Sequence, residues 1–179
     1  DLLLANKLWI VNELNLRIAH QLIALSGVKL EAIKKVYSHP MALKQCLTFL
    51  AKHPKWEIVE APDTAGSVAM LAIQKNKQAA AIASAFAARI YDMNISAADI
   101  ETTKQNFTKF FVLSKKQLKK GDKTSFACTL KHEPGSLFLL LKVFADRGIN
   151  LTKIESRPMV GDVWHYCFYI DIERNIYAN

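Results

Sequence analysis

Two polar residues stand at the start of an apolar segment and have the types and spacing needed to hold a small polar ligand. Asn106 and Thr108 are two positions apart, and an apolar, aromatic run follows from Phe110 to Leu113. On a strand, residues two apart point to the same face, so one ligand could meet an amide and a hydroxyl together. The run predicts a buried strand. The alternative is an ordinary strand that happens to start with polar residues.

Further hydroxyl and amide groups stand at or near the expected starts of helices. Ser38 precedes a His-Pro pair that suits the first turn of a helix, and Gln45 follows it seven positions later, roughly on one face. Asp63, Thr64 and Ser84 stand at two further expected helix starts. Free N–H groups at helix starts attract anions, so several starts at one edge of a sheet would form an anion-binding cleft. Taken singly, each residue is also an ordinary N-cap.

Other kinds of chemistry find no support in the motifs. The sequence has no glycine-rich phosphate loop, no Walker pattern, no cluster of metal ligands and no Ser/His/Asp order. Cys46, Cys128 and Cys167 are widely spaced within apolar patterns, which predicts buried free thiols in a reducing cytoplasm rather than disulfides or zinc ligands. We therefore expect no metal and no cofactor.

The elements that must position these residues alternate between short strands and short helices. Extended segments are expected over 9–16 and 17–22, and strands over 33–37, 56–59 and 78–82, with 95–100 leading back to the Asn106 segment. A helix from Pro40 carries apolar residues at i, i+3, i+4 and i+7, which predicts one buried stripe. Those residues are Leu43, Cys46, Leu47 and Leu50. Two more helices are expected from Asp63-Thr64 and Ser84, and the alternation predicts an α/β lobe with a covered sheet.

A lysine-rich connector over residues 115–123 leads to a second, smaller unit over 124–179. Strands are expected over 125–130, 150–155 and 163–170, and a helix is expected from Pro134-Gly135 to a C-cap at Gly148. Its apolar face consists of Leu137, Leu140, Leu141 and Phe144. The order is βαββ, whereas a ferredoxin-like βαββαβ unit needs one more helix and strand, so the chain is expected to be cut at this end.

Charge and hydropathy limit the partners. The net charge is +8, and five lysines crowd the connector without interleaved aromatic residues, which is more typical of a solvated linker than of a nucleic-acid site. The remaining charge favours small anionic ligands. The longest apolar run, 79–88, is too short to cross a bilayer. Because the chain opens with Asp1 inside an apolar run, we expect it to be a piece of a longer protein.

Five segments, in this order and over nearly the whole chain, carry a resemblance to a known family. They are Tyr37-Ser38-His39-Pro40, Ala80-Ala81-Ile82-Ala83-Ser84, Asn106-Phe107-Thr108-Lys109-Phe110, Pro134-Gly135-Ser136-Leu137 and Asn150-Leu151-Thr152-Lys153-Ile154-Glu155-Ser156-Arg157-Pro158. With these segments the chain resembles prephenate dehydratase with a C-terminal ACT regulatory domain. The last segment is the most specific.

The resemblance implies a fold, a reaction and a set of site residues. Residues 1–114 would be one lobe, with a return strand, of a type II periplasmic-binding-protein-like catalytic domain, and 124–179 would be a truncated ferredoxin-like ACT domain. The family enzyme converts prephenate to phenylpyruvate in phenylalanine synthesis, with loss of water and carbon dioxide. Thr108 would protonate the departing ring hydroxyl. The implied substrate-binding residues are Ser38, Gln45, Ser84, Asn106 and Lys109.

The resemblance also implies regulation by phenylalanine, bound between ACT domains of two subunits. The implied allosteric residues are Gly135, Ser136, Leu137, Asn150, Leu151, Glu155, Ser156, Arg157 and Pro158. This arrangement predicts a homodimer or homotetramer, with prephenate and L-phenylalanine as small-molecule partners and with neither nucleic acid nor membrane as a partner.

The chain departs from the family pattern at several points. Lys109 stands where the family has arginine, which keeps the charge but loses the planar fork that holds a carboxylate. Ser136 stands where alanine is usual. The family's N-terminal glycine-rich segment and Glu-Asn motif have no counterpart before Asp1, so we expect this chain alone to be inactive. Two alternatives stay open: a non-catalytic amino-acid-sensing relative, and nucleic-acid binding through the connector.

Overall fold

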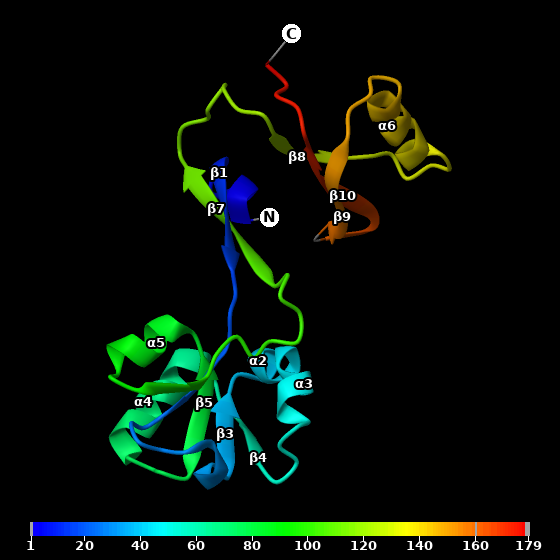
Figure 1. Ribbon diagram of the computed structural model, residues 1–179. Coiled ribbons are helices and arrows are strands. Elements are labelled where there is room, and N and C mark those ends of the chain that lie inside the picture. The colour runs from blue at the N-terminus through cyan, green and yellow to red at the C-terminus, as the bar shows by residue number, and fades with distance from the viewer. Residues whose placement is uncertain (1, 160, 178–179) are drawn as a thin grey trace. The chain divides into compact units, whose positions relative to one another are not determined.

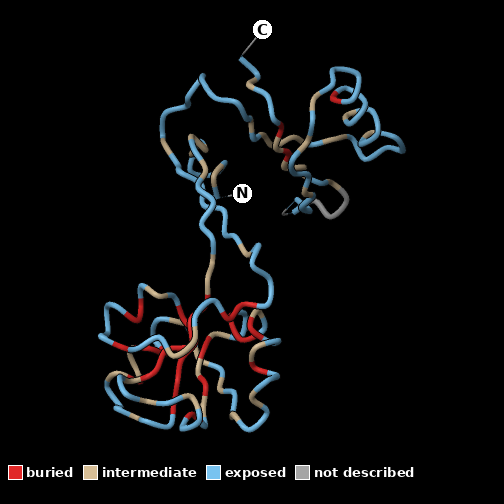
Figure 2. Tube along the Cα trace, in the orientation of Figure 1, coloured by how far each residue is buried: buried red, intermediate tan, exposed pale blue. Residues whose placement is uncertain are grey.

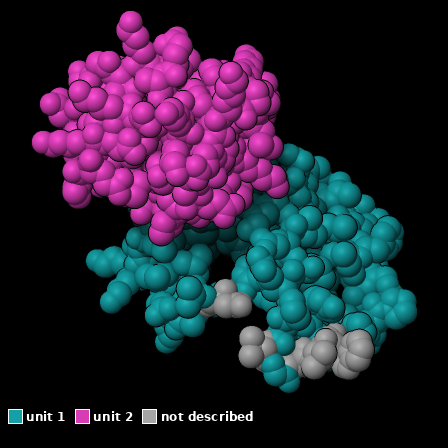
Figure 3. Space-filling view, turned by 90° about the horizontal axis from the view of Figure 1, so that it is seen from below, with its two compact units in different colours: residues 1–14, 111–179 teal, residues 15–110 magenta. Residues whose placement is uncertain are grey.

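A computed structural model describes residues 2–159 and 161–177, and within these the side chains of 162–164 are not described. The chain divides into two compact units, residues 15–110 and residues 1–14 with 111–179 (Figure 3). Buried positions concentrate in the unit formed by residues 15–110 (Figure 2). Among the described residues, no helix combines the length and the apolar character needed to cross a membrane.

Residues 15–110 form a five-stranded sheet in the order β4-β3-β5-β2-β6 (Figure 1). Its strands are β2 (Gln21–Ala24), β3 (Lys35–Ser38), β4 (Glu57–Glu60), β5 (Ala79–Ala83) and β6 (Asn94–Ala97). Strand β3 runs parallel to β4 and β5, whereas β2 runs antiparallel to β5 and β6. The strands expected over 33–37, 56–59 and 78–82 are confirmed, with ends shifted by one or two residues. The extended segment expected over 17–22 is corrected, since residues 18–20 lie in no strand and β2 begins at Gln21. Strand β6 ends at Ala97 rather than at residue 100.

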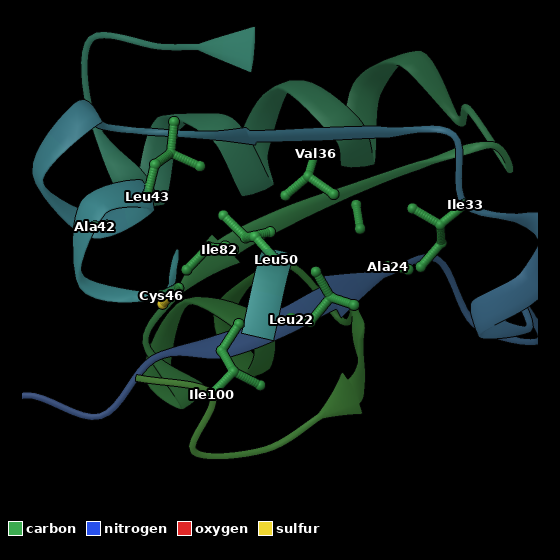
Figure 4. Packing of buried hydrophobic residues seen from close by; sticks show 11 residues of the cluster. Leu22, Ala24, Ile33, Val36, Ala42, Leu43, Cys46, Leu50, Ile82 and Ile100 are labelled. Carbon is green, nitrogen blue, oxygen red and sulfur yellow. The ribbon is translucent and has the colours of Figure 1, made fainter. Parts of the chain in front are cut away.

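Helices cover both faces of this sheet, as the alternating sequence predicted. They are α2 (Pro40–Gln45), α3 (Leu47–Leu50), α4 (Thr64–Gln74) and α5 (Ala85–Ile90), with a short 3₁₀ turn at Leu30–Ala32. On β5, Ala80 and Ile82 join the core beneath α2 and α3 (Figure 4). Ala79, Ala81 and Ala83 of the same strand join the core beneath α4 and α5. Successive strand residues point to opposite faces, so one small-residue strand serves both cores.

The segment after Pro40 corrects the prediction of one continuous helix. Cys46 has φ −108° and ψ 16°, which breaks the segment into α2 and α3. Leu43, Cys46 and Leu50 are buried as predicted, but Leu47 is 58% exposed because the break turns it out of the stripe. The N-cap is His39, whose Nδ1 accepts from the Met41 N–H at 3.1 Å.

The caps of the next two helices follow the prediction. The Asp63 carboxylate accepts from the backbone N–H of Gly66 at the start of α4. Ser84 Oγ accepts from the N–H of Ala87 at 3.3 Å at the start of α5. These short polar side chains replace the partners that the first N–H groups of a helix lack.

The strand that starts near Asn106 was predicted to be buried, and this was wrong. Among the described residues, strand β7 (Phe107–Ser114) pairs with β1 (Trp9–Arg17) alone, in a two-stranded sheet. Helix α1 (Leu2–Ala5) precedes β1. Phe110 is 50% exposed and Leu113 is 43% exposed. A two-stranded ribbon without a covering layer leaves apolar side chains in contact with solvent, however strand-like their sequence is.

The last part of the chain has the predicted βαββ order. It consists of β8 (Thr124–Thr129), α6 (Ser136–Ala145), β9 (Leu151–Met159) and β10 (Asp162–Ile172), and the sheet order is β8-β10-β9. Its core contains Phe144, Ile170 and Ile172.

Two details of α6 differ from the prediction. Only Phe144 of its predicted apolar face is fully buried, while Leu137 and Leu141 stay accessible because the three-stranded sheet covers little of the helix. The helix is capped at Asp146 rather than at Gly148, which lies two residues later with a left-handed φ of 61°. The connector over residues 115–123 contains neither helix nor strand.

Candidate active site

Several polar residues meet at one edge of the five-stranded sheet. The parallel strands β3 and β5 end there, at Ser38 and Ala83. Because β2 is antiparallel to β5, Gln21 pairs with Ala83, and His20 directly before Gln21 therefore lies at the same edge. Ligands often bind at the carboxyl ends of parallel strands, since loops and helix starts converge there.

His20, Gln45 and Asn106 form a chain of side chains at this edge. His20 Nε2 lies 2.7 Å from Gln45 Oε1, and Gln45 Nε2 lies 3.5 Å from Asn106 Oδ1. Gln45 is the last residue of α2, and Asn106 immediately precedes β7. The backbone carbonyl of Asn106 accepts from the N–H of Ile18 at 2.8 Å, so the segments that enter and leave the sheet are joined here.

Glu101 holds the same two segments together from inside the protein. Its side chain is fully buried, accepts from the backbone N–H of His20 at 3.0 Å, and pairs with Arg17 at 3.0 Å and Lys104 at 3.3 Å. Burial alone would raise the pKa of this carboxyl. Hydrogen bonds from the backbone N–H groups of His20 and Glu101 and from Lys104 lower the pKa, and together they outweigh the effect of burial. The net pKa lies below its usual value, so Glu101 is ionised at neutral pH.

The two predicted serines lie at this edge but contact the scaffold. Ser38 is fully buried, and its hydroxyl donates to the carbonyl of Ile82 at 2.6 Å, which ties the end of β3 to β5. Ser84 is exposed at the start of α5. The structure therefore puts the hydroxyl of Ser84 at the surface and that of Ser38 inside the sheet.

The predicted proton donor lies just beyond the amide chain. Thr108 is the second residue of β7, two positions after Asn106, and is exposed. Within the described part of the chain its hydroxyl makes no hydrogen bond, so it is available to a ligand. Lys109 follows on the same strand and is exposed as well.

The residues predicted to bind phenylalanine lie on α6 and β9. Gly135 caps α6 with a left-handed φ of 85°, and Ser136 and Leu137 open the helix. On β9, Glu155 pairs with Lys153 at 3.1 Å and accepts from Arg157 Nε at 2.7 Å, and these partners hold the pKa of its carboxyl below the usual range.

The other predicted members of this group flank the same strand. Leu151 begins β9, and Asn150 just before it donates to Glu173 Oε2 at 3.0 Å. Ser156 and Pro158 are exposed and pair with Phe168 and Tyr166 of β10.

Sequence reasoning missed three residues of the edge, Arg17, His20 and Glu101. The contacts of Glu101 with Arg17 and His20 join positions 84 and 81 residues apart. The local signal was weak: Arg17 begins the extended segment expected over 17–22, and Glu101 directly follows the one expected over 95–100. Among the described residues, no group of His, Cys, Asp and Glu side chains could hold a metal ion.

The chain is similar to proteins of a known family. The model of the family described as prephenate dehydratase matches residues 1–118. Arogenate dehydratase 2 of Petunia hybrida is 43% identical over 98% of this chain and 49% of its own length. The prephenate dehydratase of Methanocaldococcus jannaschii is 42% identical over 98% of this chain and 65% of its own length. The chain thus spans about half to two thirds of these relatives.

A solved structure shares the fold as well. The prephenate dehydratase of Arthrobacter aurescens, solved in complex with L-Phe, superposes with a TM-score of 0.80 and 30% identity, over 93% of this chain and 56% of that one. The predicted fold class, an α/β periplasmic-binding-protein-like lobe followed by a smaller βαββ unit, is confirmed. On the match of the family model and the identity to these relatives, the chain belongs to the prephenate dehydratase family.

Proposed function

We propose that the full-length protein containing this chain converts prephenate to phenylpyruvate in phenylalanine synthesis. The observation that carries the proposal is the joined pair of amides, Gln45 and Asn106, with the available hydroxyl of Thr108 two residues further along. The M. jannaschii relative is named for prephenate and the Petunia relative for arogenate. We prefer prephenate to arogenate as the substrate because arogenate carries an ammonium group and is therefore less negative. The chain has a net charge of +8, which favours the more anionic ligand.

The reaction needs one proton delivered to a leaving hydroxyl. The bond between the ring and its carboxylate breaks, and its electron pair moves into the ring as the C–O bond breaks on the opposite carbon. Carbon dioxide leaves, the hydroxyl departs as water after taking a proton, and the ring becomes aromatic. A threonine hydroxyl is a weak acid, so Thr108 donates this proton in concert with C–O cleavage. Positioned proton transfer of this kind contributes about 10²–10⁴-fold to a rate.

The neighbouring residues supply binding for an anionic substrate. Gln45 and Asn106 contribute amide N–H groups, and Lys109 contributes an ammonium on the strand that carries Thr108. Ser84 adds an exposed hydroxyl at the start of α5. Ser38 acts from inside, where its bond to Ile82 fixes the end of β3 from which α2 and Gln45 continue.

Phenylpyruvate formation by the full-length protein tests the proposal. We expect wild type to form phenylpyruvate from prephenate and Thr108→Ala to be slower by about 10²–10⁴-fold. Thr108→Ser should retain much of the rate because it keeps a hydroxyl. Thr103→Ala, at an exposed threonine earlier in the same segment, is the matched control and should behave as wild type. Equal rates for wild type and Thr108→Ala would remove the assigned role.

Regulation by phenylalanine forms the second part of the proposal. The βαββ unit with Gly135 at the start of α6 and the Glu155–Arg157 pair on β9 supports it, as does the relative solved with L-Phe. In this proposal phenylalanine binds between the ACT domains of two copies, so the protein is a homodimer or homotetramer. The free thiols favour a reducing cytoplasm as its compartment.

A non-catalytic amino-acid sensor is the second candidate, and Lys109 is the observation that favours it. Lysine cannot form the bidentate pair with a carboxylate that an arginine forms. This candidate predicts phenylalanine binding without phenylpyruvate formation from either prephenate or arogenate. The same rate measurement, combined with calorimetric titration of phenylalanine, separates the two candidates.

A further inference from the structure

His20 has no role in the proposed reaction so far, although it touches Gln45 directly. We infer that His20 is a positioning residue whose Nε2–H sets the direction of the amide chain, so that Asn106 presents an N–H donor to the substrate. The inference rests on the proposed function for the identity of the substrate. The hydrogen-bond direction itself can be tested without any reaction.

The three side chains can be connected in only two consistent directions. If His20 Nε2 carries the hydrogen, it donates to Gln45 Oε1, and Gln45 Nε2 then donates toward Asn106 Oδ1. Asn106 is left with Nδ2 as its terminal group. If Nε2 is bare, both amides must turn over, and Asn106 is left with a carbonyl oxygen in that place. The hydrogen on one ring nitrogen thus decides whether the chain ends in a donor or an acceptor.

The terminal group is a second observation that points to a ligand. Asn106 Nδ2 is buried and has no hydrogen-bond partner among the described residues. Buried polar atoms are rarely left unpaired, and an unpaired donor indicates a partner supplied from elsewhere. An oxygen of an anionic substrate, a carboxylate or a hydroxyl, satisfies an N–H donor. A carbonyl in the same place would repel it.

The position of His20 is held independently of the amide chain. The residue is buried, its backbone N–H donates to Glu101 Oε2 at 3.0 Å, and its carbonyl accepts from the N–H of Ile100 at 2.9 Å. The backbone is therefore fixed on both sides, and the ring is left to bond with Gln45. A ring attached to this fixed backbone keeps the Gln45 amide from turning over.

Nitrogen NMR of the full-length protein, labelled with ¹⁵N-histidine and without ligand, tests the direction. We expect the His20 ring to carry hydrogen on Nε2, and we expect its Nε2 shift to change in Gln45→Leu, which removes the acceptor. His20→Gln identifies the signal by its disappearance. A ring with hydrogen on Nδ1 and a bare Nε2 would overturn the inference.

Kinetics test whether His20 acts through Gln45. We expect His20→Leu to raise KM for prephenate about tenfold, with a smaller change in kcat. A tenfold change corresponds to the loss of one charge-assisted hydrogen bond, here the bond from Asn106 to the substrate. His20→Gln keeps an N–H donor and should recover part of the loss. The double variant His20→Leu/Gln45→Leu should have the KM of Gln45→Leu alone. A KM equal to the product of the two single effects would contradict the inference.

The controls separate this inference from the proposed function. His53→Leu alters a histidine that stacks on Trp56 at 3.9 Å, away from the amide chain, and should leave KM unchanged. If wild type turns over neither prephenate nor arogenate, the proposed function fails, while the NMR measurement still decides the direction. If His20→Leu does not fold, Gln45→Leu and the NMR measurement decide on their own.

Discussion

The backbone N–H of His20 donates to Oε2 of Glu101 at 3.0 Å, across 81 positions of sequence. The carboxylate also pairs with Arg17, on the segment that enters the five-stranded sheet, and with Lys104, on the segment that leaves it. The same segments carry His20 and Asn106 to the amide chain. One buried charge therefore closes the lobe and also determines where the candidate active site lies.

Removing the charge of Glu101 should destabilise the protein. Oε1 of Glu101 accepts from Arg17 and Lys104, and Oε2 accepts from the His20 N–H. In Glu101→Gln only one end of the amide can accept, so either the His20 N–H or the two cations lose their acceptor. Because both cations are largely exposed, we expect a loss of about 1–3 kcal/mol in the free energy of unfolding, measured by urea denaturation. Glu57→Gln removes an exposed carboxylate that pairs with Lys35 and should cost about 0–1 kcal/mol. Equal losses in the two variants would contradict this ranking.

The contribution of Glu101 should disappear in acid. Its pKa in the folded protein lies below the usual 4.5, so the stabilisation is fully present above that value and is lost as pH falls through the lowered pKa. We expect the difference in Tm between wild type and Glu101→Gln to be constant near neutrality and to shrink as pH falls below 4.5. A difference that stays the same down to pH 3 would show that the charge contributes nothing.

Restoring arginine at position 109 should strengthen substrate binding. An arginine can hold a carboxylate with two parallel hydrogen bonds, whereas the ammonium of Lys109 acts as a single point charge. We expect Lys109→Arg to lower KM for prephenate severalfold and Lys109→Met to raise it by about tenfold or more, since one charge-assisted hydrogen bond is lost. Lys116→Arg, in the connector, is the control for added arginine. An unchanged KM in both Lys109 variants would place this side chain outside the site.

Phenylalanine binding should depend on the charged pair of β9. Arg157 Nε donates to Glu155 at 2.7 Å. In the proposed regulation, this bond orients its guanidinium for the carboxylate of phenylalanine. We expect Arg157→Ala and Glu155→Ala each to weaken phenylalanine binding by about tenfold, measured by calorimetric titration of the full-length protein. Arg147→Ala removes an exposed arginine just after α6 and should leave the affinity unchanged.

The three thiols should differ in reactivity. Cys46 is fully buried. Its burial, and to a smaller extent the nearby Glu101 carboxylate, raise the pKa of its thiol to about 12. Cys128 and Cys167 are partly accessible. Since the thiolate is the reactive form, we expect a disulfide reagent at pH 8 to modify Cys46 last, and quickly only after unfolding. Cys46→Ser identifies its phase in the reaction, and a fast phase that disappears in this variant would contradict the expectation.

Local patterns predicted the parts of the fold that local physics decides. The caps at Asp63 and Ser84 follow from short polar side chains at helix starts, and the strand β5 follows from an apolar run of the right length. The break at Cys46 could not be read in this way, because the apolar spacing continues across it. The exposure of β7 was also hidden, since a strand-like sequence does not reveal whether a second layer covers it.

The candidate site was predictable only in part. Motif resemblance pointed to Gln45, Asn106 and Thr108, and the first two do meet at the edge of the sheet. His20 and Glu101 were missed because their partners lie far away in the sequence, and the pairing of β2 with β5 and β6 brings them together. The sequence shows which residues can do chemistry, whereas topology decides which of them share a site.

That pairing also sets an order of events while the chain is being made. Strand β2 pairs with β5 and β6, both of which follow it by more than fifty residues. After Leu22 and Ile23 are synthesised, the whole of β3, β4 and α4 must follow before the strand partners of these residues on β5 and β6 exist. Pairings between distant segments form late, and apolar strands that wait for them are prone to aggregate. The strand that completes the edge of the candidate site emerges before both of its partners, and it is paired on both sides only after β6 is made.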